Sequence, residues 1–303
     1  MTNQNASQPP EHLSPEEFRR HGYALIDWIA DYWQRVEELP VMSQIQPGAI
    51  RELLPPSAPE HGEPFERLIE DLDAIVMPGV SHWQSPSWFA YFPANSSPPS
   101  VLAELVSAGL GVQGMLWSTS PAATEIESHV LDWLIDLLDL PESWRTTEQG
   151  GGVLQMSASD STHTALVVAR HQAANLGIRP ESMVAYASTQ THSSIQKGAT
   201  VAGYGHVRLI DVDDQQAMRI DALEAALDED RAGGLTPIFV AATIGTTGTT
   251  GVDPLRAIGE VCRKEKLWLH VDAAYAGTAM LCPEFRHHQD GLELADSYTF
   301  NPH

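Results

Sequence analysis

Positive charge is scarce in this 303-residue chain, which has 17 Lys and Arg residues against 40 Asp and Glu and a formal net charge of −23. Such a surface repels nucleic acids and anionic membranes, so neither is expected as a partner. The remaining composition is ordinary for a globular protein, with 43% apolar and 19% charged residues. The length is sufficient for one large domain and a smaller one.

Cysteine is also rare. Cys262 and Cys282 are too few for a disulfide framework, so a reducing, cytoplasmic compartment is expected. The first residues lack the basic and apolar regions of a secretory signal, and the least polar stretch, 101–117, still carries a glutamate and several glycines. The sequence RHHQD at 286–290 has no third ligand at a suitable spacing, so no metal site is expected.

Two amphipathic helices are predicted near the N-terminus. The sequence SPEE at 14–17 is a capping box with proline in the first helical position, and apolar residues at helical spacing follow it. After a proline-rich linker, a second helix is expected over 65–76, ended by the sequence MPG at 77–79. These helices cannot close a core alone. Residues 1–97 are therefore expected to form a tail and a helical dimerisation segment.

Strands and helices alternate in the remaining part, 98–303, which is expected to be a large α/β domain. A helix capped by Ser120 is expected to bury Ile126, Val130, Trp133, Leu134 and Leu137. Apolar runs then predict strands at 183–187, 207–212, 237–244, 267–271 and 297–300. Between them we expect helices at 161–175, 192–202, 221–231 (with Asp221 and Glu224 as a capping box) and 254–265. This alternation indicates a mainly parallel sheet flanked by helices, which binds ligands at the carboxyl ends of its strands.

Three features fall at that edge of the predicted sheet. The sequence GGGVLQMSASDST at 150–162 places hydroxyl groups and free backbone N–H groups at a helix start, which suits a phosphate, although capping by Ser159 or Ser161 explains it equally. Asp272 ends an apolar strand, where a buried charge needs a partner such as a cationic ring nitrogen, unless it is only a turn aspartate. His192 follows the strand at 183–187.

The uncharged segment 81–100 is rich in Trp, Phe, Tyr and Pro and contains no Asp, Glu, Lys or Arg. It is either an aromatic plug between domains or the wall of a pocket for an aromatic ligand.

Together these segments resemble the pyridoxal-phosphate-dependent group II decarboxylases, close to the aromatic-L-amino-acid decarboxylases. The matching segments run in family order from about residue 14 to the end: MPGVSHWQSP, FAYFP, SPAATEIE, GGGVLQMSASDST, HSSIQ, GTTGTTG, LHVDAAYAG, CPEFRH and FNPH. The resemblance implies the type I pyridoxal-phosphate fold, with pyridoxal 5′-phosphate as cofactor and a homodimer as the assembly.

The resemblance also implies site residues. Asp272 would pair with the protonated ring nitrogen, so that the ring accepts electrons as CO2 leaves. His192 would stack on one face of the ring and Ala274 would pack beneath the other. The expected cofactor-binding residues are Ser157, Ala158, Ser159, His192, Thr247, Asp272, Ala274, Asn301 and His303, of which His192, Asp272 and His303 are expected to be catalytic.

The family pattern at the C-terminal end is N-P-H-K, so the residue after His303 is expected to be the lysine that binds the cofactor covalently. Lys197, Lys264 and Lys266 are the lysines of this chain, and none is at a position where the family needs one. The C-terminal small domain and the mobile catalytic loop are expected to be absent from this chain.

The resemblance implies decarboxylation of an aromatic L-amino acid to the amine and CO2. The expected substrate-binding residues are Trp83, Tyr91, Phe92, Pro93, Ala94, Gln113 (from the partner chain) and His192. Ala94 stands where relatives often carry a hydroxyl group, and Gln113 replaces a more apolar residue, which leaves the substrate open. The alternatives are an aromatic aldehyde synthase of the same fold, against which His192 argues, and a truncated, non-catalytic fragment.

Overall fold

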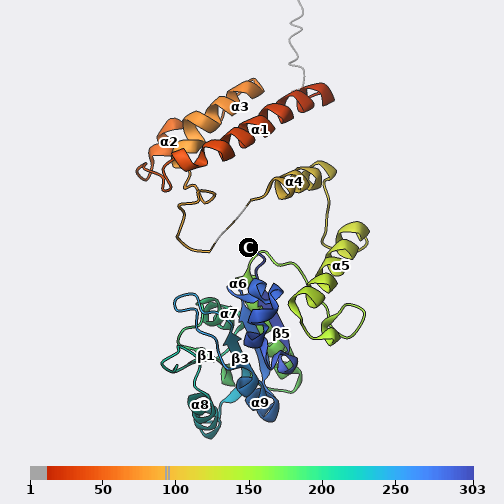
Figure 1. Ribbon diagram of the computed structural model, residues 1–303, viewed down its shortest axis with the longest axis vertical. Helices are drawn as coiled ribbons and strands as arrows, with labels where there is room; N and C mark the ends of the chain where they lie inside the picture. Colours follow the sequence, from red (N-terminus) through yellow and green to blue (C-terminus); the bar gives the residue numbers. More distant parts are fainter. Residues whose placement is uncertain (1–11, 93, 95) are drawn as a thin grey trace, which may run out of the picture. The chain divides into compact units, whose positions relative to one another are not determined.

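The computed structural model describes residues 12–92, 94 and 96–303, in two compact units (Figure 1). The first unit extends to Leu105 and the second begins at Val106. The boundary lies inside helix α4 (Pro98–Leu110), none of whose residues is buried.

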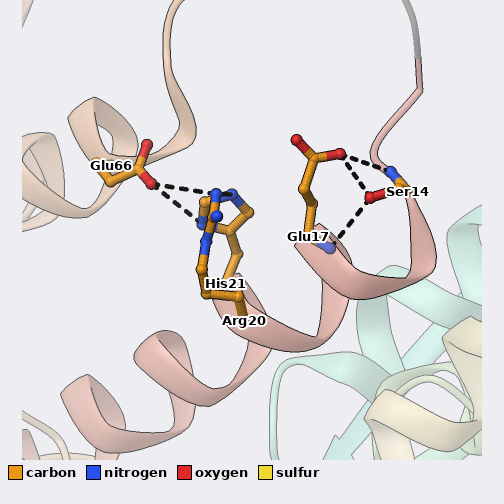
Figure 2. Close-up of polar contacts among 5 residues, drawn as sticks. All are labelled: Ser14, Glu17, Arg20, His21 and Glu66. Atoms are coloured by element: carbon orange, nitrogen blue, oxygen red, sulfur yellow. Dashed lines mark hydrogen bonds and ion pairs between the residues drawn. The ribbon is translucent and has the colours of Figure 1, made fainter.

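The first unit begins with helix α1 (Pro15–Arg35), whose start confirms the predicted capping box (Figure 2). Ser14 Oγ accepts from the backbone N–H of Glu17 at 3.3 Å, and the Glu17 carboxylate accepts from the Ser14 N–H at 2.9 Å. Two of the free N–H groups at the helix start are thereby satisfied. The short helix α2 (Ala49–Leu53) follows. Helix α3 (Phe65–Asp71) continues as a π-helical turn, Leu72–Val76, and ends in a 3₁₀ turn, Met77–Gly79, where the sequence predicts the stop.

Helices α1 and α3 are joined by contacts around Glu66. Its carboxylate lies 3.5 Å from Arg20 and 3.8 Å from His21, and the buried His21 ring packs on Phe65 with 4.5 Å between ring centroids (Figure 2). Phe18, on the same helix α1, is 60% exposed. The first unit therefore leaves large apolar side chains uncovered.

The second unit is built on a five-stranded sheet whose pairs are all parallel, which confirms the predicted fold class (Figure 1). The order is β2-β1-β3-β4-β5. The strands are β1 (Met183–Ser188), β2 (His206–Ile210), β3 (Thr236–Thr243), β4 (Trp268–Ala273) and β5 (Ser297–Phe300), at the predicted places. The helices are α5 (Pro121–Leu138), α6 (Ala158–Asn175), α7 (Ser194–Ala202), α8 (Ile220–Ala232) and α9 (Leu255–Glu265).

Each face of the sheet has its own apolar core. Residues from α6 and α7 cover one face, where Leu166 and Ile195 pack with Phe239 of β3. Residues from α5, α8 and α9 cover the other face, where Ile258 packs with Leu269 of β4. Burial on both faces explains why the inner strands β1, β3 and β4 are mainly apolar in sequence.

Two local predictions are wrong. Of the α5 residues expected to face inward, Ile126, Trp133 and Leu137 are exposed, Val130 is half-buried, and Leu134 packs against the core as expected. Ile135 and Leu138, which the sequence does not predict to face inward, are buried. This helix is apolar around most of its circumference, so periodicity alone cannot identify the face that meets its own core. The capping box at Asp221 is also absent. Helix α8 begins one residue earlier, and the Asp221 carboxylate pairs with the Arg219 guanidinium.

Within the described part of the chain, no helix is both long enough and apolar enough to cross a membrane.

The packing of α6 gives a direct test of the core. Leu166 is fully buried, and a methyl group added at Gly198 of α7 would lie only 2.9 Å from its Cδ1. In the full-length protein, Leu166→Ala is expected to lower the free energy of unfolding by about 2–5 kcal/mol, because it leaves a cavity. The neighbouring Val167, 42% exposed, is the control, and Val167→Ala is expected to cost less than about 1 kcal/mol. If urea denaturation showed the same loss of unfolding free energy in both variants, the described packing would be contradicted.

Candidate active site at the carboxyl edge of the sheet

The N-terminus of α6 supplies the first part of the site. Ser157, not Ser159 or Ser161, is the N-cap. Its hydroxyl accepts from the Asp160 N–H at 3.2 Å and donates to the Asp160 carboxylate at 2.9 Å. The N–H groups of Ala158 and Ser159 precede the first intrahelical bond. They point out of the helix at its positive end, an arrangement that binds anions such as phosphate.

Asp272 lies at the carboxyl end of β4 and is only 5% exposed. Its Oδ1 accepts from the Ala274 N–H at 3.1 Å. Among the described residues, no Lys or Arg forms an ion pair with it. Burial raises the pKa of Asp272, and the Ala274 hydrogen bond and the nearby His192 act in the opposite direction. A cationic group at this position would stabilise the ionised carboxylate.

His192 lies in the loop between β1 and α7. Its Nδ1 accepts from the Ser194 N–H at 3.2 Å and from the Ser194 hydroxyl at 2.9 Å, so the neutral ring carries its proton on Nε2. The ring is exposed and lines a pocket of about 190 Å³. Ser159, Asp160, His163 and Lys197 line the same pocket. The α6 N-terminus and His192 are therefore neighbours.

The remaining predicted cofactor residues follow strands β3, β4 and β5. Thr247 is exposed in the loop after β3. The backbone oxygen of Asn301 accepts from the Thr278 hydroxyl, and His303 Nε2 donates to the Tyr275 oxygen at 3.1 Å. Since parallel strands end at one edge, all the predicted cofactor residues lie at the carboxyl edge of the sheet or at the α6 N-terminus, and the chain's C-terminus lies there too (Figure 1).

The sequence does not identify one residue that stabilises the carboxyl edge of the sheet. Asp253 is 2% exposed, and its two oxygens accept from the backbone N–H groups of Met218 at 2.7 Å and Thr243 at 2.8 Å. It ties the loop after β3 to the turn before α8. Burial raises the pKa of Asp253 to about 6. The sequence GVDP at 251–254 is typical of an ordinary helix start. The proline after Asp253 is the one sequence feature that indicates a fixed turn.

The predicted substrate residues are divided between the two units. In the first unit, the Trp83 ring stacks on Trp88 at 4.6 Å and on Tyr91 at 5.6 Å, and Phe92 is half-buried. The oxygen of Ala94 accepts from the Gln84 amide. Pro93 lies outside the described residues.

Gln113 belongs to the second unit, where its side chain is exposed and its backbone oxygen accepts from the Thr119 hydroxyl at 2.8 Å.

The described residues contain no group of three or more His, Cys, Asp or Glu side chains that could hold a metal ion.

Comparison with known proteins decides the family. The family model "Pyridoxal-dependent decarboxylase conserved domain" matches residues 47–303. The chain belongs to this family. Membership confirms the cofactor class expected from the sequence, and the solved relatives confirm the fold.

The relatives include a phenylacetaldehyde synthase from Arabidopsis thaliana, 46% identical over 96% of this chain and 61% of that protein. An aromatic-L-amino-acid decarboxylase from Bos taurus is 46% identical over 96% of this chain and 62% of its own length. The crystal structure of Catharanthus roseus tryptophan decarboxylase with L-tryptophan has a TM-score of 0.92 and 39% identity, and covers 97% of this chain and 64% of that one. The chain thus spans about three fifths of the length of these relatives.

The residues at the sheet edge fit pyridoxal phosphate. A buried carboxylate that pairs with no Lys or Arg among the described residues suits the basic ring nitrogen, and the N–H groups at the α6 start suit the phosphate. Gly245 allows the loop after β3 to pack closely on the segment after β4, because its φ is +85° and an added Cβ would lie 2.8 Å from Ala276 Cβ.

Substitution of Asp253 tests whether this residue stabilises the carboxyl edge of the sheet. In the full-length protein, Asp253→Ala is expected to lower the free energy of unfolding by about 2–4 kcal/mol, because two buried N–H groups lose their acceptor. Asp214→Ala is the control, because Asp214 is exposed in the nearby turn. It is expected to change the free energy of unfolding by less than about 0.5 kcal/mol. Hydrogen exchange should accelerate at the amides of Met218 and Thr243. Unchanged exchange at both amides would show that Asp253 does not hold the edge.

Proposed function

We propose that the full-length protein that contains this chain removes CO2 from aromatic L-amino acids and releases the amine. The observation that carries the proposal is the buried Asp272 carboxylate, which forms no ion pair with a Lys or Arg among the described residues, in a chain of the pyridoxal-dependent decarboxylase family. A carboxylate at that position holds a proton on a ring nitrogen beside it, and a protonated ring is what decarboxylation requires.

The cofactor would be held by groups at three strand ends and one helix start. The N–H groups of Ala158 and Ser159 would bind the phosphate, with Ser157 fixing the helix start through Asp160. Asp272 would accept a hydrogen bond from the ring nitrogen, and Ala274 would leave space for a flat ring. Thr247, Asn301 and His303 would contribute further contacts.

When bound, pyridoxal phosphate supplies an electron-accepting ring that takes up the electron pair left behind as CO2 departs. Asp272 stabilises the positive ring nitrogen throughout. His192 offers a fixed Nε2–H, since its Nδ1 is occupied by Ser194. That N–H can orient a substrate carboxylate or hold a proton near the reacting carbon.

The proposed substrate class rests on the composition of the segment 81–94. It contains no Asp, Glu, Lys or Arg and presents stacked rings at Trp83, Trp88 and Tyr91. The carboxylate of an acidic substrate would lie against these uncharged residues without a partner for its charge. An aromatic side chain would instead bury apolar surface and contact the rings. Relatives named tryptophan decarboxylase and tyrosine decarboxylase support the same class.

A second candidate is an aromatic aldehyde synthase. The observation that favours it is the 46% identity to the phenylacetaldehyde synthase, together with a 4-hydroxyphenylacetaldehyde synthase structure from Rhodiola rosea at a TM-score of 0.92. Such an enzyme consumes O2 and water and releases aldehyde, CO2, ammonia and hydrogen peroxide. His192 argues for simple decarboxylation.

We further propose a homodimer in the cytoplasm. Helix α4 buries none of its residues although it is apolar, with Leu110 73% exposed, and α1 leaves Phe18 and Tyr23 uncovered. Apolar surface of this extent is typical of obligate interfaces. Cys262 and Cys282 form no disulfide in the described structure, which agrees with a reducing compartment.

The oligomeric state can be measured by sedimentation of the full-length protein. We expect a dimer, and we expect deletion of residues 14–77 to give insoluble protein or an inactive monomer. A soluble, active monomer after this deletion would contradict the assignment of the segment.

The reaction can be measured with a panel of amino acids and the full-length enzyme loaded with pyridoxal phosphate. We expect tryptophan, tyrosine, phenylalanine or dihydroxyphenylalanine to give the amine and CO2 in a 1:1 ratio without consumption of O2. Glutamate and aspartate should react at least about 100-fold more slowly, because their charge would be unpaired. Aldehyde and peroxide as products would establish the second candidate, and the highest kcat/KM for glutamate would refute the aromatic pocket.

A further inference from the structure

The loop after β3 is closed from the inside by a buried threonine side chain. Thr246 is only 1% exposed, although residues 247–250, which follow it, are all exposed. Its hydroxyl oxygen accepts from the Gly251 N–H at 2.9 Å and shares a second hydrogen bond with the Thr249 hydroxyl at 2.8 Å. The side chain thus joins the start of the loop to its end. The function proposed above gives it no role.

Backbone hydrogen bonds close the loop at the same point. The N–H groups of Gly245 and Thr246 both donate to the Gly251 oxygen, at 3.0 and 2.9 Å, and the Thr250 N–H donates to the Thr246 oxygen at 2.8 Å. Both polar backbone groups of Gly251 are therefore bound to the start of the loop. Since residues 247–250 connect the two ends, a displacement of Thr246 would move all of them.

The closed loop imposes an unfavourable backbone conformation on Thr250. Its φ is +57°, in the left-handed region, where a β-branched residue is an outlier. Backbone strain of this kind persists only where the surrounding contacts over-determine it. The bonds of Thr246 to the Thr250 N–H and to the Gly251 N–H are such contacts, because they fix the chain on both sides of the Thr250 α-carbon. Thr246 therefore holds the loop in one conformation.

The start of this loop is fixed to the strand that carries Asp272. The Ile244 N–H donates to the backbone oxygen of Asp272 at 2.9 Å. Gly245 then packs so closely on the segment after β4 that an added Cβ would lie 2.8 Å from Ala276 Cβ. The buried part of the loop is thus anchored at the carboxyl edge of the sheet, and Thr247 is the first exposed residue beyond that anchor.

We infer that Thr246 is a positioning residue for Thr247. Its hydroxyl closes the loop and thereby fixes the Thr247 side chain at the carboxyl edge of the sheet. The inference rests on the proposed cofactor site, in which the Thr247 hydroxyl contacts pyridoxal phosphate. Thr246 itself contacts neither cofactor nor substrate, because it is buried and its own hydroxyl is used twice within the loop.

The test compares two substitutions of Thr246 in the full-length protein. Thr246→Val keeps the shape of the side chain and removes the hydroxyl, whereas Thr246→Ser keeps the hydroxyl. The measurement is the affinity of the cofactor-free protein for pyridoxal phosphate, from the absorbance of the bound cofactor. Thr246→Val is expected to weaken binding at least about tenfold, because the Gly251 N–H loses its acceptor and the loop opens. Thr246→Ser should remain within about threefold of wild type.

Thr250→Val is the matched control, because it removes a hydroxyl from the same loop and keeps the branched side chain. The Thr250 hydroxyl donates to the oxygen of the neighbouring Thr249, so it does not join the two ends of the loop. This variant should bind the cofactor within about threefold of wild type. Wild-type affinity in Thr246→Val, or equal losses in Thr246→Val and Thr250→Val, would overturn the inference.

A double-mutant cycle with Thr247→Val shows whether Thr246 acts through Thr247. Residues that act through one contact give losses that are not additive. In the Thr247→Val background, Thr246→Val should therefore weaken binding by less than about threefold. Additive losses would show that Thr246 only stabilises the domain, and would refute its role in positioning. The proposed function is tested separately: if Asp272→Asn binds the cofactor poorly while Thr246→Val binds it normally, only the role of Thr246 fails.

Hydrogen exchange in the cofactor-free protein tests the closure of the loop directly. The Gly251 amide should exchange faster in Thr246→Val than in wild type, and at the wild-type rate in Thr246→Ser and Thr250→Val. Thr249→Val removes only the second hydrogen bond of Thr246 from an exposed position, and its exchange rate should be intermediate. It replaces Thr246→Val if that variant does not fold. A wild-type exchange rate at Gly251 in both Thr246→Val and Thr249→Val, or in Thr249→Val where it is the one that folds, would contradict the closure.

Discussion

The carboxyl edge of the sheet depends on one costly arrangement, the burial of the Asp272 carboxylate at the end of β4 without an ion pair to any Lys or Arg among the described residues. A charge in that position is unfavourable until a cation arrives, so the site is electrostatically prepared for the protonated ring of its cofactor. The fold provides this position, because the central strands β3 and β4 are covered on both faces and are buried up to their carboxyl ends.

The surrounding structure keeps that edge fixed. Asp253 binds two backbone N–H groups from different segments, and Gly245 adopts a conformation in which a side chain would collide with Ala276. Ser157 fixes the start of α6, and Ser194 fixes the tautomer of His192. Each contact holds a backbone segment or a ring in place at the carboxyl edge of the sheet or at the start of α6, so contacts within the chain organise the site.

Much of this could be predicted from the sequence. The five strands are short, mainly apolar segments separated by helical patterns, and Asp272, His192 and the glycine-rich segment before α6 are recognisable as residues at strand ends or at a helix start. The inward face of α5 could not be predicted, because that helix is apolar on several sides. Asp253 could not be recognised either, since its acceptor role needs Met218, 35 residues away. The contact of Trp268 with Ser297 joins residues 29 positions apart, so it becomes visible only when β4 and β5 pair.

The central claim is that Asp272 keeps the ring nitrogen of pyridoxal phosphate protonated. The most direct measurement is the nitrogen-15 NMR shift of ring-labelled cofactor bound to the full-length protein. The account predicts the shift of a protonated pyridine nitrogen in the wild type across neutral pH, and that of an unprotonated nitrogen in Asp272→Asn. An unprotonated nitrogen in the wild type, or the same protonated signal in both proteins, would contradict it.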